Sequence, residues 1–339
     1  MAEILNKSIN EDPIMKIENL KTYFDAGKKD GEQLYVKAVD DVSLNIRRGE
    51  VIGLVGESGS GKSTIAYTIM GMYKPTAGRI FYEGKELALS STKRGMDIRR
   101  DIQIVFQDPG TSLNPHQTVQ KILEMPLKVH KICKTKEERE ARVKELLSMV
   151  ELPENYMYKT PGQMGGGERQ MVSIARALAS EPKMIILDEP TSALVVSIQA
   201  KIINMLLTLQ KERNLTYLFI THDLSLMRNI STRVAILYLG RIAELAPTVD
   251  FFEKPQHPYT KMLLSSIPVV SDEEDALKPE KVESVGEIPS PVNIPPGCSF
   301  HQRCYAAMDK CSIDDPVMKN YTGDHYVRCH LCEDCNNAD

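Results

Sequence analysis

The sequence of 339 residues has no marked excess of charge of either sign, with 42 Lys and Arg residues against 46 Asp and Glu residues. A chain whose main partner is nucleic acid usually carries a basic field, and none is present. No apolar run approaches the roughly 20 residues that span a bilayer, and residues 1–11 lack the apolar core of a signal peptide. We therefore expect a cytosolic protein with two domains, or with one α/β domain and a sizeable appendage.

Disulfide bonds are not expected in such a compartment, so the seven cysteines are interpreted as thiols or metal ligands. Most lie at or after Cys298, which marks the tail as chemically separate. The spacing C-x5-C-x6-C-x17-C joins Cys298, Cys304, Cys311 and Cys329. Four thiolates in an appendage with little apolar content suit a metal that replaces a core, although the spacing fits no ferredoxin pattern and free thiols stay open. Cys332 and Cys335 could supply an alternative ligand, and Cys133 is considered unrelated.

Residues 56–64, GESGSGKST, have the form GxxxxGK[ST] and follow an apolar run at 51–55. This order predicts a strand, a glycine loop and a helix start. Backbone N–H groups of such a loop surround phosphate oxygens, the lysine reaches the β and γ phosphates, and the hydroxyl after it ligates Mg²⁺. A Gly/Ser-rich turn without a ligand is the alternative, which the flanking strand and helix disfavour. We expect a nucleoside triphosphate to be bound by Gly56, Ser58, Gly59, Ser60, Gly61, Lys62, Ser63 and Thr64.

Apolar alternation predicts antiparallel strands at 15–22 and 36–46, with a charged loop at 26–33 between them. Tyr23 and Phe24 end the first strand, where an aromatic ring could stack on adenine or belong to the core. Further strands are expected at 79–82, 102–106, 217–221, 233–239 and 241–245. Gln107 and His222 follow two of these strands, at the end where ligands of open α/β sheets bind, although a lone histidine is more often structural.

The apolar residues 184–187 are followed directly by Asp188 and Glu189. Strands buried on both faces of a parallel sheet have this composition. Asp188 could hold the Mg²⁺ shell, and Glu189 could polarise the attacking water. The alternative is an exposed acidic turn, which the phosphate loop upstream makes less attractive.

Residues 110–165 read as a helical insertion, with helices at 119–129 and at 135–150, the second opened by a capping box of Thr135 and Glu138. Four glycines at 162–167 precede a helix at 168–179, which gives either a second phosphate-compatible helix start or a hinge. Another helix is expected at 197–213. After 245 the composition shifts, with an acidic linker at 271–281 and a Pro-rich extended segment at 288–297.

The order of the phosphate loop, Gln107, the glycine segment, the Asp188-Glu189 pair and His222 resembles that of ABC-type ATPases over nearly the whole chain. The resemblance implies a RecA-like α/β core with an antiparallel β subdomain and a helical subdomain, and a head-to-tail dimer with ATP between subunits. Phe24, with Tyr23 second, then matches the adenine-stacking aromatic residue. Gln107 matches the Q-loop glutamine, which is a further Mg²⁺ contact in the family. His222 matches the switch histidine. Phosphate contacts across the dimer fall on Gly165, Gly166 and Gly167.

On this resemblance the ABC core comprises residues 14–108 and 166–245, the helical subdomain 109–165 and a C-terminal extension 246–339. The extension is similar to that of ATPase subunits of oligopeptide and dipeptide importers at residues 257–260 (HPYT), 286–291 (GEIPSP), 297–300 (GCSF) and 303–304 (RC). Such a subunit lies at the cytoplasmic face of the membrane with two permease subunits and an extracytoplasmic binding protein. Relatives carry peptides, nickel or oligosaccharides. The loop from Gln107 through Pro115 would receive a permease helix, and the resemblance favours a [4Fe-4S] cluster in the tail, with a zinc site as its main rival.

Two departures from the family pattern stand out. The signature, usually Leu-Ser-Gly-Gly-Gln, is replaced by MGGGE at 164–168, and the D-loop, usually Ser-Ala-Leu-Asp, ends in Val195. Both elements act on the partner's nucleotide, so we expect one half of an asymmetric heterodimer with a paralogous ATPase subunit. A soluble ABC ATPase without a membrane partner and a scaffold that no longer hydrolyses ATP remain alternatives, although the intact Glu189 argues against the scaffold.

Overall fold

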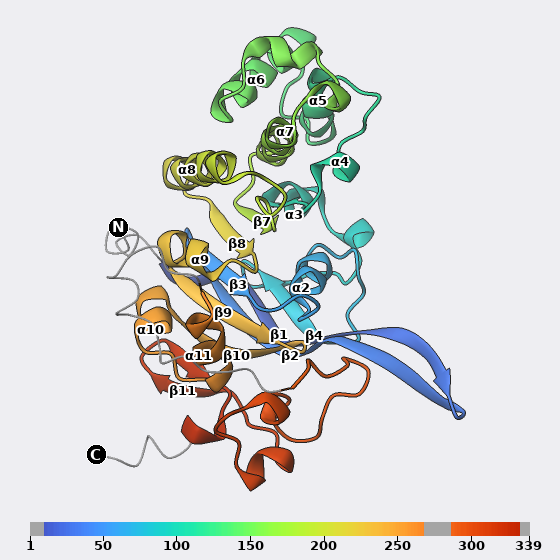
Figure 1. Cartoon of the computed structure of the whole chain (residues 1–339). Helices are drawn as coiled ribbons and strands as arrows, with labels where there is room; N and C mark the ends of the chain where they lie inside the picture. Colours follow the sequence, from blue (N-terminus) through green and yellow to red (C-terminus); the bar gives the residue numbers. More distant parts are fainter. Residues whose placement is uncertain (1–9, 268–285, 333–339) are drawn as a thin grey trace. The chain divides into compact units, whose positions relative to one another are not determined.

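The structure, a computed structural model, describes residues 10–267 and 286–332 and divides into two compact units (Figure 1). The first unit is drawn from Met1–Leu89 and Thr221–Asp339, and the second is Ser90–Ile220. The predicted acidic linker at 271–281 lies outside the described residues. Among the described residues, no helix has the length and apolar character needed to cross a bilayer.

An antiparallel sheet in the first unit has the order β2-β1-β4-β5 and comprises β1 (Asn10–Lys29), β2 (Glu32–Arg48), β4 (Ala77–Tyr82) and β5 (Lys85–Glu86). The strands predicted at 15–22, 36–46 and 79–82 are confirmed. The loop predicted at 26–33 is wrong, because pairing continues to Lys29 and Glu32 and leaves only the turn at Asp30 and Gly31. Both turn residues have positive φ, 52° and 87°, as a tight hairpin turn requires. Side chains near this tip are exposed, so the hairpin drawn in Figure 1 carries no hydrophobic pattern there.

The first unit also holds five strands in the order β11-β12-β10-β9-β3. These are β3 (Val51–Val55), β9 (Arg233–Tyr238), β10 (Arg241–Pro247), β11 (Lys319–Thr322) and β12 (His325–Val327). β3 and β9 are parallel, whereas the other neighbours are antiparallel. The strands predicted from apolar runs at 51–55, 233–239 and 241–245 are confirmed. The cysteine-rich tail adds β11 and β12 beside β10, with Glu244 opposite Val327.

Short helices accompany these sheets of the first unit. They are α2 (Lys62–Ile69), α9 (Leu224–Ile230), α10 (Thr248–Glu253), α11 (Pro258–Ser265), η5 (His301–Arg303), η6 (Asp309–Ser312) and η7 (His330–Cys332). The core beside them includes fully buried Ile52, Leu54, Phe251 and Tyr259. The phosphate loop therefore joins a buried strand, β3, to a helix, α2, as the sequence predicts.

The second unit contains three parallel strands in the order β8-β7-β6, with β6 (Ile102–Val105), β7 (Met184–Asp188) and β8 (Thr216–Ile220). Every residue of β7 and β8 is buried, which accounts for their apolar composition. Its helices are η2 (Ser91–Lys93), α3 (Met96–Asp101), α4 (Pro109–Ser112), α5 (Val119–Val129), α6 (Lys136–Met149), η3 (Glu154–Tyr158), η4 (Pro161–Gln163), α7 (Gly166–Leu178) and α8 (Val196–Arg213). The predicted capping box of Thr135 and Glu138 opens α6.

Candidate nucleotide-binding site

The phosphate loop has a backbone that only glycine adopts easily. Gly56, Gly59 and Gly61 have φ values of 149°, 76° and 106°. A Cβ on Gly56 would lie 2.3 Å from the carbonyl oxygen of Leu237 in β9, and a Cβ on Gly61 would lie 2.0 Å from that of Ala38 in β2. The close approach of β2 and β9 therefore fixes glycine at both ends of the loop.

Lys62 directs its side chain into this loop. Its Nζ donates to the carbonyl oxygens of Gly56 at 2.7 Å and of Glu57 at 2.9 Å, and to Ser60 Oγ at 3.5 Å. Helix α2 begins at Lys62 with Gly61 as its N-cap, and no side-chain hydrogen bond caps it. Ser63 is the second residue of α2. An ammonium group inside a glycine loop that opens a helix fits the oxygens of a triphosphate with its Mg²⁺ ion.

Asp188 and Glu189 follow one another at the carboxyl end of β7. Asp188 is fully buried, whereas Glu189 is half-buried and has φ of 44°. A left-handed backbone at a residue other than glycine costs on the order of 1 kcal/mol and is often found at functional sites. The N–H of Glu189 donates to Ile220 O at 2.9 Å, and its Oε2 accepts a hydrogen bond of 3.0 Å from Gln107 Nε2. The second unit thus brings Gln107 and Glu189 together.

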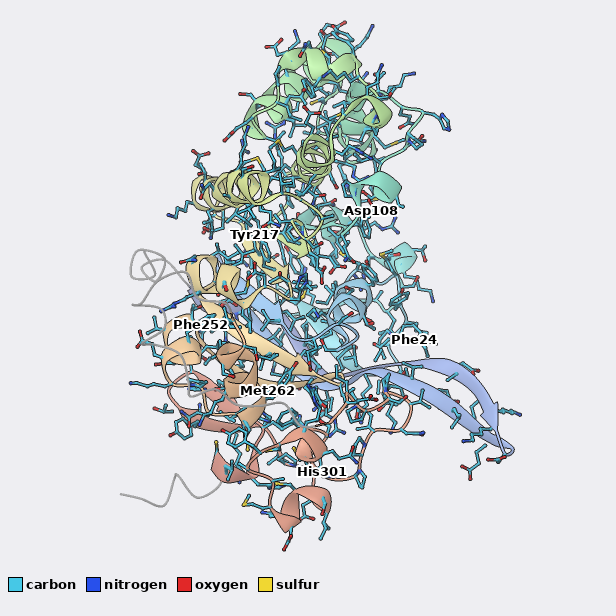
Figure 2. The ribbon with its side chains drawn as sticks, in the orientation of Figure 1. Phe24, Asp108, Tyr217, Phe252, Met262 and His301 are labelled. Atoms are coloured by element: carbon cyan, nitrogen blue, oxygen red, sulfur yellow. The ribbon has the colours of Figure 1, made fainter. Side chains whose placement is uncertain are left out.

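The two candidate adenine-stacking residues have different surroundings in the first unit. The Tyr23 hydroxyl donates to Asp40, and burial with this bond raises the pKa of Tyr23. Phe24, labelled on β1 in Figure 2, is half-buried and meets Tyr73 edge to face with ring centroids 5.1 Å apart. Neither ring is buried in the core. The exposed His222 directly precedes Asp223, which caps α9.

The glycine segment before α7 is closed by a side chain of that helix. Glu168 Oε2 accepts the N–H of Gly165 at 2.8 Å, and Oε1 accepts the hydroxyl of Tyr156. These two bonds hold the pKa of Glu168 below its ordinary value, and the bond from Tyr156 has the larger effect. Gly165 has an ordinary φ of −69°, and a Cβ there would meet only Glu168 Oε2, at 3.7 Å. A Cβ on Gly167 would lie 2.5 Å from Ile198 in α8, so that glycine is needed for packing.

Comparison with known proteins assigns the family. Residues 39–192 match the family described as "ABC transporter", and residues 243–311 match "Oligopeptide/dipeptide transporter, C-terminal region". The oligopeptide transport ATP-binding protein AppF of Bacillus subtilis is 45% identical over 95% of this chain and 98% of its own length. The chain belongs to the ABC transporter ATPases. Oligopeptide transport ATP-binding protein OppF of Haemophilus influenzae is 41% identical over 93% of each chain.

Solved structures agree with this assignment. The dimeric ATP-binding cassette MJ0796, bound to ADP and Pi after hydrolysis, has a TM-score of 0.61 at 32% identity over 69% of this chain and 98% of its own. The protein cbiO1 of Clostridium perfringens, part of the transporter complex cbiONQ, has a TM-score of 0.60 at 30% identity over 72% and 92%. The expected RecA-like ABC ATPase fold is therefore confirmed, and this chain is an ATPase.

The segment at 192–195, which the sequence predicts to be the D-loop, is held by a residue that the sequence did not indicate. Gln199, in the first turn of α8, donates from Nε2 to the carbonyl oxygens of Thr191 at 3.0 Å and Leu194 at 2.9 Å. Val195, which stands where the family pattern has aspartate, occupies the N-cap position of α8 without a side-chain capping bond and is 68% exposed. An amide side chain one turn into the helix after the D-loop is the signal that could have indicated this contact.

Among the described residues of the extension, no cysteine forms a disulfide bond. Burial raises the pKa of Cys298 to about 12 and that of Cys304 to about 11. A hydrogen bond with Cys332 lowers the pKa of Cys329 to about 7. Within residues 10–267 and 286–332, no group of three or more His, Cys, Asp or Glu side chains is arranged to hold a metal ion. The predicted [4Fe-4S] or zinc site at Cys298, Cys304, Cys311 and Cys329 is therefore not supported, and Cys335 lies outside the described residues.

Proposed function

We propose that this ABC ATPase energises an importer of oligopeptides or dipeptides. The observation that carries the proposal is the joint presence of a nucleotide-binding cassette and the C-terminal region of oligopeptide/dipeptide transporters in one chain. The chain would lie at the cytoplasmic face of the membrane against two permease subunits, to which an extracytoplasmic binding protein delivers the solute. No nucleic acid is among the proposed partners.

Affinity purification of the tagged full chain from membranes tests this assignment. We expect two integral membrane proteins and a second ATPase subunit to co-purify, and peptide uptake by cells to depend on the chain. Recovery with ribosomes or DNA, or with no membrane protein, would instead support a soluble ABC ATPase.

Within the chain, we assign ATP binding to the phosphate loop, with Lys62 on the β and γ phosphates and Ser63 as a Mg²⁺ ligand. Buried Asp188 and exposed Gln107 are the candidate Mg²⁺ contacts of the second unit. Bound Mg²⁺ would neutralise phosphate charge. The side chain that holds the attacking water is assigned to Glu189, whose contact with Gln107 keeps its carboxylate in one orientation. His222 would sense the γ phosphate.

Glu189→Gln is the sharpest test of these roles. The amide keeps the size of the side chain but cannot accept the proton of water, so hydrolysis should fall by about 10²–10⁴-fold while MgATP binding stays nearly unchanged. Hydrolysis at the parental rate by the assembled transporter would reject the assignment. Lys62→Ala should instead weaken binding itself.

We assign adenine stacking to Phe24 in preference to Tyr23, because the Tyr23 hydroxyl is held by Asp40. Phe24→Ala should weaken ATP binding by about tenfold, or about 1.4 kcal/mol, which lies within the 1–3 kcal/mol of a base–aromatic stack. Tyr23→Phe, which keeps the ring, is the matched control and should bind normally. Equal losses in both variants would contradict the choice.

We infer that the segment from Gln107 to Pro115 receives a short cytoplasmic helix of a permease. Asp108, labelled in Figure 2, caps α4 by accepting the N–H of Gly110 at 2.7 Å, and Arg176 in α7 donates to Ser112 O at 2.5 Å. Asn114 and Pro115 are exposed on this well-held loop. A cross-linker on Asn114 should label a permease, and labelling of soluble proteins alone would count against this docking role of the segment.

We further propose that the working unit is an asymmetric heterodimer with a paralogous ATPase subunit. The signature has no hydroxyl at Gly165, and the D-loop has Val195 in place of aspartate, so a homodimer would combine two incomplete sites. The phosphate-loop lysine, or the glutamate that holds the water, should be mutated in one subunit at a time: Lys62 or Glu189 in this chain, and then the equivalent residue in the partner subunit. Lys62 and Glu189 mutations should then be the more damaging, and full activity of this chain as a homodimer would refute the asymmetry.

The cysteines are retained as candidate ligands, with a [4Fe-4S] cluster preferred over zinc. Support comes from the sequence spacing and from electrostatics, because burial and, after it, the charges of Cys311 and Cys329 raise the pKa values of Cys298 and Cys304. Anaerobically purified protein should be brown and contain iron, whereas Cys304→Ser should reduce the iron content. A colourless chain with zinc, or with neither metal, would remove the cluster from the proposal.

A further inference from the structure

The C-terminal extension holds the phosphate loop through a two-pronged ion pair. Arg303 Nη1 lies 2.9 Å from Glu57 Oε2, and Nη2 lies 3.2 Å from Glu57 Oε1. Glu57 is the second residue of the loop, and the two residues are 246 positions apart. The arginine is only 6% exposed. A buried guanidinium that meets both oxygens of one carboxylate fixes direction as well as distance.

The same loop residue is held by its backbone. The N–H of Glu57 donates to the hydroxyl of Tyr259 at 3.2 Å, and Tyr259, in α11, is fully buried. The Tyr259 ring packs against Tyr238 and Phe300, with centroid distances of 4.8 and 5.3 Å. The guanidinium carbon of Arg303 lies 5.8 Å from the centre of the Tyr238 ring and 5.9 Å from that of Phe300. Arg303 ends η5, whose first residue, His301, is labelled in Figure 2.

Glu57 connects the anchor formed by Arg303 and Tyr259 to Lys62, the proposed ATP-binding lysine. Its carbonyl oxygen accepts a hydrogen bond of 2.9 Å from Lys62 Nζ, so one residue is held by Arg303 and Tyr259 and in turn orients Lys62. We propose that Arg303 is a positioning residue for the phosphate loop, acting through Glu57 on Lys62, with Tyr259 holding the loop backbone. This inference rests on the proposed role of Lys62 in ATP binding.

Two physical effects follow from the contact. A glycine-rich loop has high conformational entropy, and a loop already held in its binding conformation loses less entropy when ATP binds. In addition, the Glu57 carboxylate lies in a loop that is to receive an anion, and the paired guanidinium offsets its negative charge. Both effects act on ATP affinity, whereas neither touches the attacking water.

Arg303→Gln and Arg303→Lys in the full chain test the inference, with a fluorescent ATP analogue and Mg²⁺ as the probe. The glutamine variant should bind about tenfold more weakly, because a hydrogen-bonded charge pair is lost. The lysine variant keeps the charge but not the two-pronged geometry and should recover part of the affinity. In a Glu57→Gln background, Arg303→Gln should cost little more, since its partner is already changed.

Arg328→Gln is the matched control. Arg328 also lies in the extension, but it pairs with Asp41 in β2 at 3.0 Å and not with a carboxylate of the phosphate loop. Its removal should leave nucleotide affinity within about twofold, and thermal unfolding should show whether both arginine variants are folded to the same extent. In the assembled transporter, Arg303→Gln should raise KM for ATP with kcat nearly unchanged.

Four outcomes are decisive. Equal affinities for Arg303→Gln and Arg328→Gln would overturn the inference, as would full additivity of Arg303→Gln with Glu57→Gln. If Arg303→Gln does not fold, the ATP affinities of Arg303→Lys and Glu57→Gln test the inference instead. Parental affinity in both of these variants would overturn the inference. A wild-type chain that fails to bind the probe would reject the proposed function itself, whereas failure of the positioning role alone would leave the wild-type chain and Arg328→Gln binding normally.

Discussion

The starts of α2 and α7 both follow glycine-rich segments, yet they offer different surroundings to an anion. No side chain caps the start of α2, where Gly61 is the N-cap residue. Lys62 donates its ammonium protons to oxygens of the loop. At α7, the Glu168 carboxylate already accepts the N–H of Gly165. A helix start binds an anion through its N–H groups, so a carboxylate from the same helix competes with a phosphate for them.

The glycines are also required for different reasons. Gly61 has φ of 106° and no room for a Cβ, so both conformation and packing demand glycine. Gly167 is required only by the close approach of Ile198, and Gly165 by neither effect. A count of glycines therefore does not identify a phosphate site. Backbone conformation and the group that caps the helix distinguish the two segments.

The largest expected effect comes from making the same substitution at both helix starts. Gly61→Ala places a methyl group against the carbonyl of Ala38 at a positive φ, so the loop must shift and MgATP binding should fall by more than about tenfold, since a misplaced loop loses its charge-assisted hydrogen bonds. Gly165→Ala meets neither obstacle and should leave binding by this chain's own loop unchanged. Titration with a fluorescent ATP analogue measures both.

Thermal unfolding serves as the control for this pair. Gly61→Ala should destabilise the chain by about 1 kcal/mol or more, because a residue with a Cβ is strained at this φ. Equal tolerance at the two positions would remove the distinction between the segments.

Several elements of both units could be predicted because their signals are local. Strand β3, helix α2 and the capping box of α6 follow from apolar runs, glycine spacing and a Thr-x-x-Glu pattern. The contacts that set the site's properties could not, because their partners are distant in sequence. Arg303 reaches Glu57 across 246 positions, and a periodicity within one window carries no information about such a pair.

The tip of the β1–β2 hairpin was missed for another reason. Its side chains are exposed, so the backbone ladder continues to Lys29 and Glu32 without any apolar alternation to reveal it. The metal site predicted from cysteine spacing has no support among the described residues, since spacing fixes order along the chain and not the directions of the thiols. Ligand geometry therefore cannot be inferred from such spacing alone.

A smaller effect is expected from restoring the signature hydroxyl. Gly165 has extended φ and ψ of −69° and 166°, which suit a serine N-cap, and a serine Cβ would meet Glu168 at an ordinary 3.7 Å. If the missing hydroxyl limits the partner's site, Gly165→Ser should raise ATP turnover of the assembled transporter by up to about tenfold. Gly165→Ala, which adds the Cβ without the hydroxyl, is the matched control. Equal turnover in the two variants would show that the hydroxyl is not the limiting group.

The smallest effect concerns the self-capping of α7, which distinguishes it from α2. The Tyr156 hydroxyl and the Gly165 N–H lower the pKa of Glu168 in the folded chain, so the carboxylate stabilises the fold above the ordinary glutamate pKa of about 4.3. This stability is lost as pH falls through the lower, folded-state pKa. Because the carboxylate is partly exposed, the contribution at neutral pH should be below about 1 kcal/mol.

Thermal unfolding from neutral pH to well below the ordinary glutamate pKa of about 4.3 measures this contribution. The wild-type chain should lose more stability on acidification than Glu168→Gln, which cannot ionise, and Tyr156→Phe should fall between them because it removes the larger of the two bonds. Parallel profiles for all three chains would mean that Glu168 does not hold the start of α7. That helix start would then be open to phosphate in the same way as α2, and the contrast between the two segments would rest on glycine conformation alone.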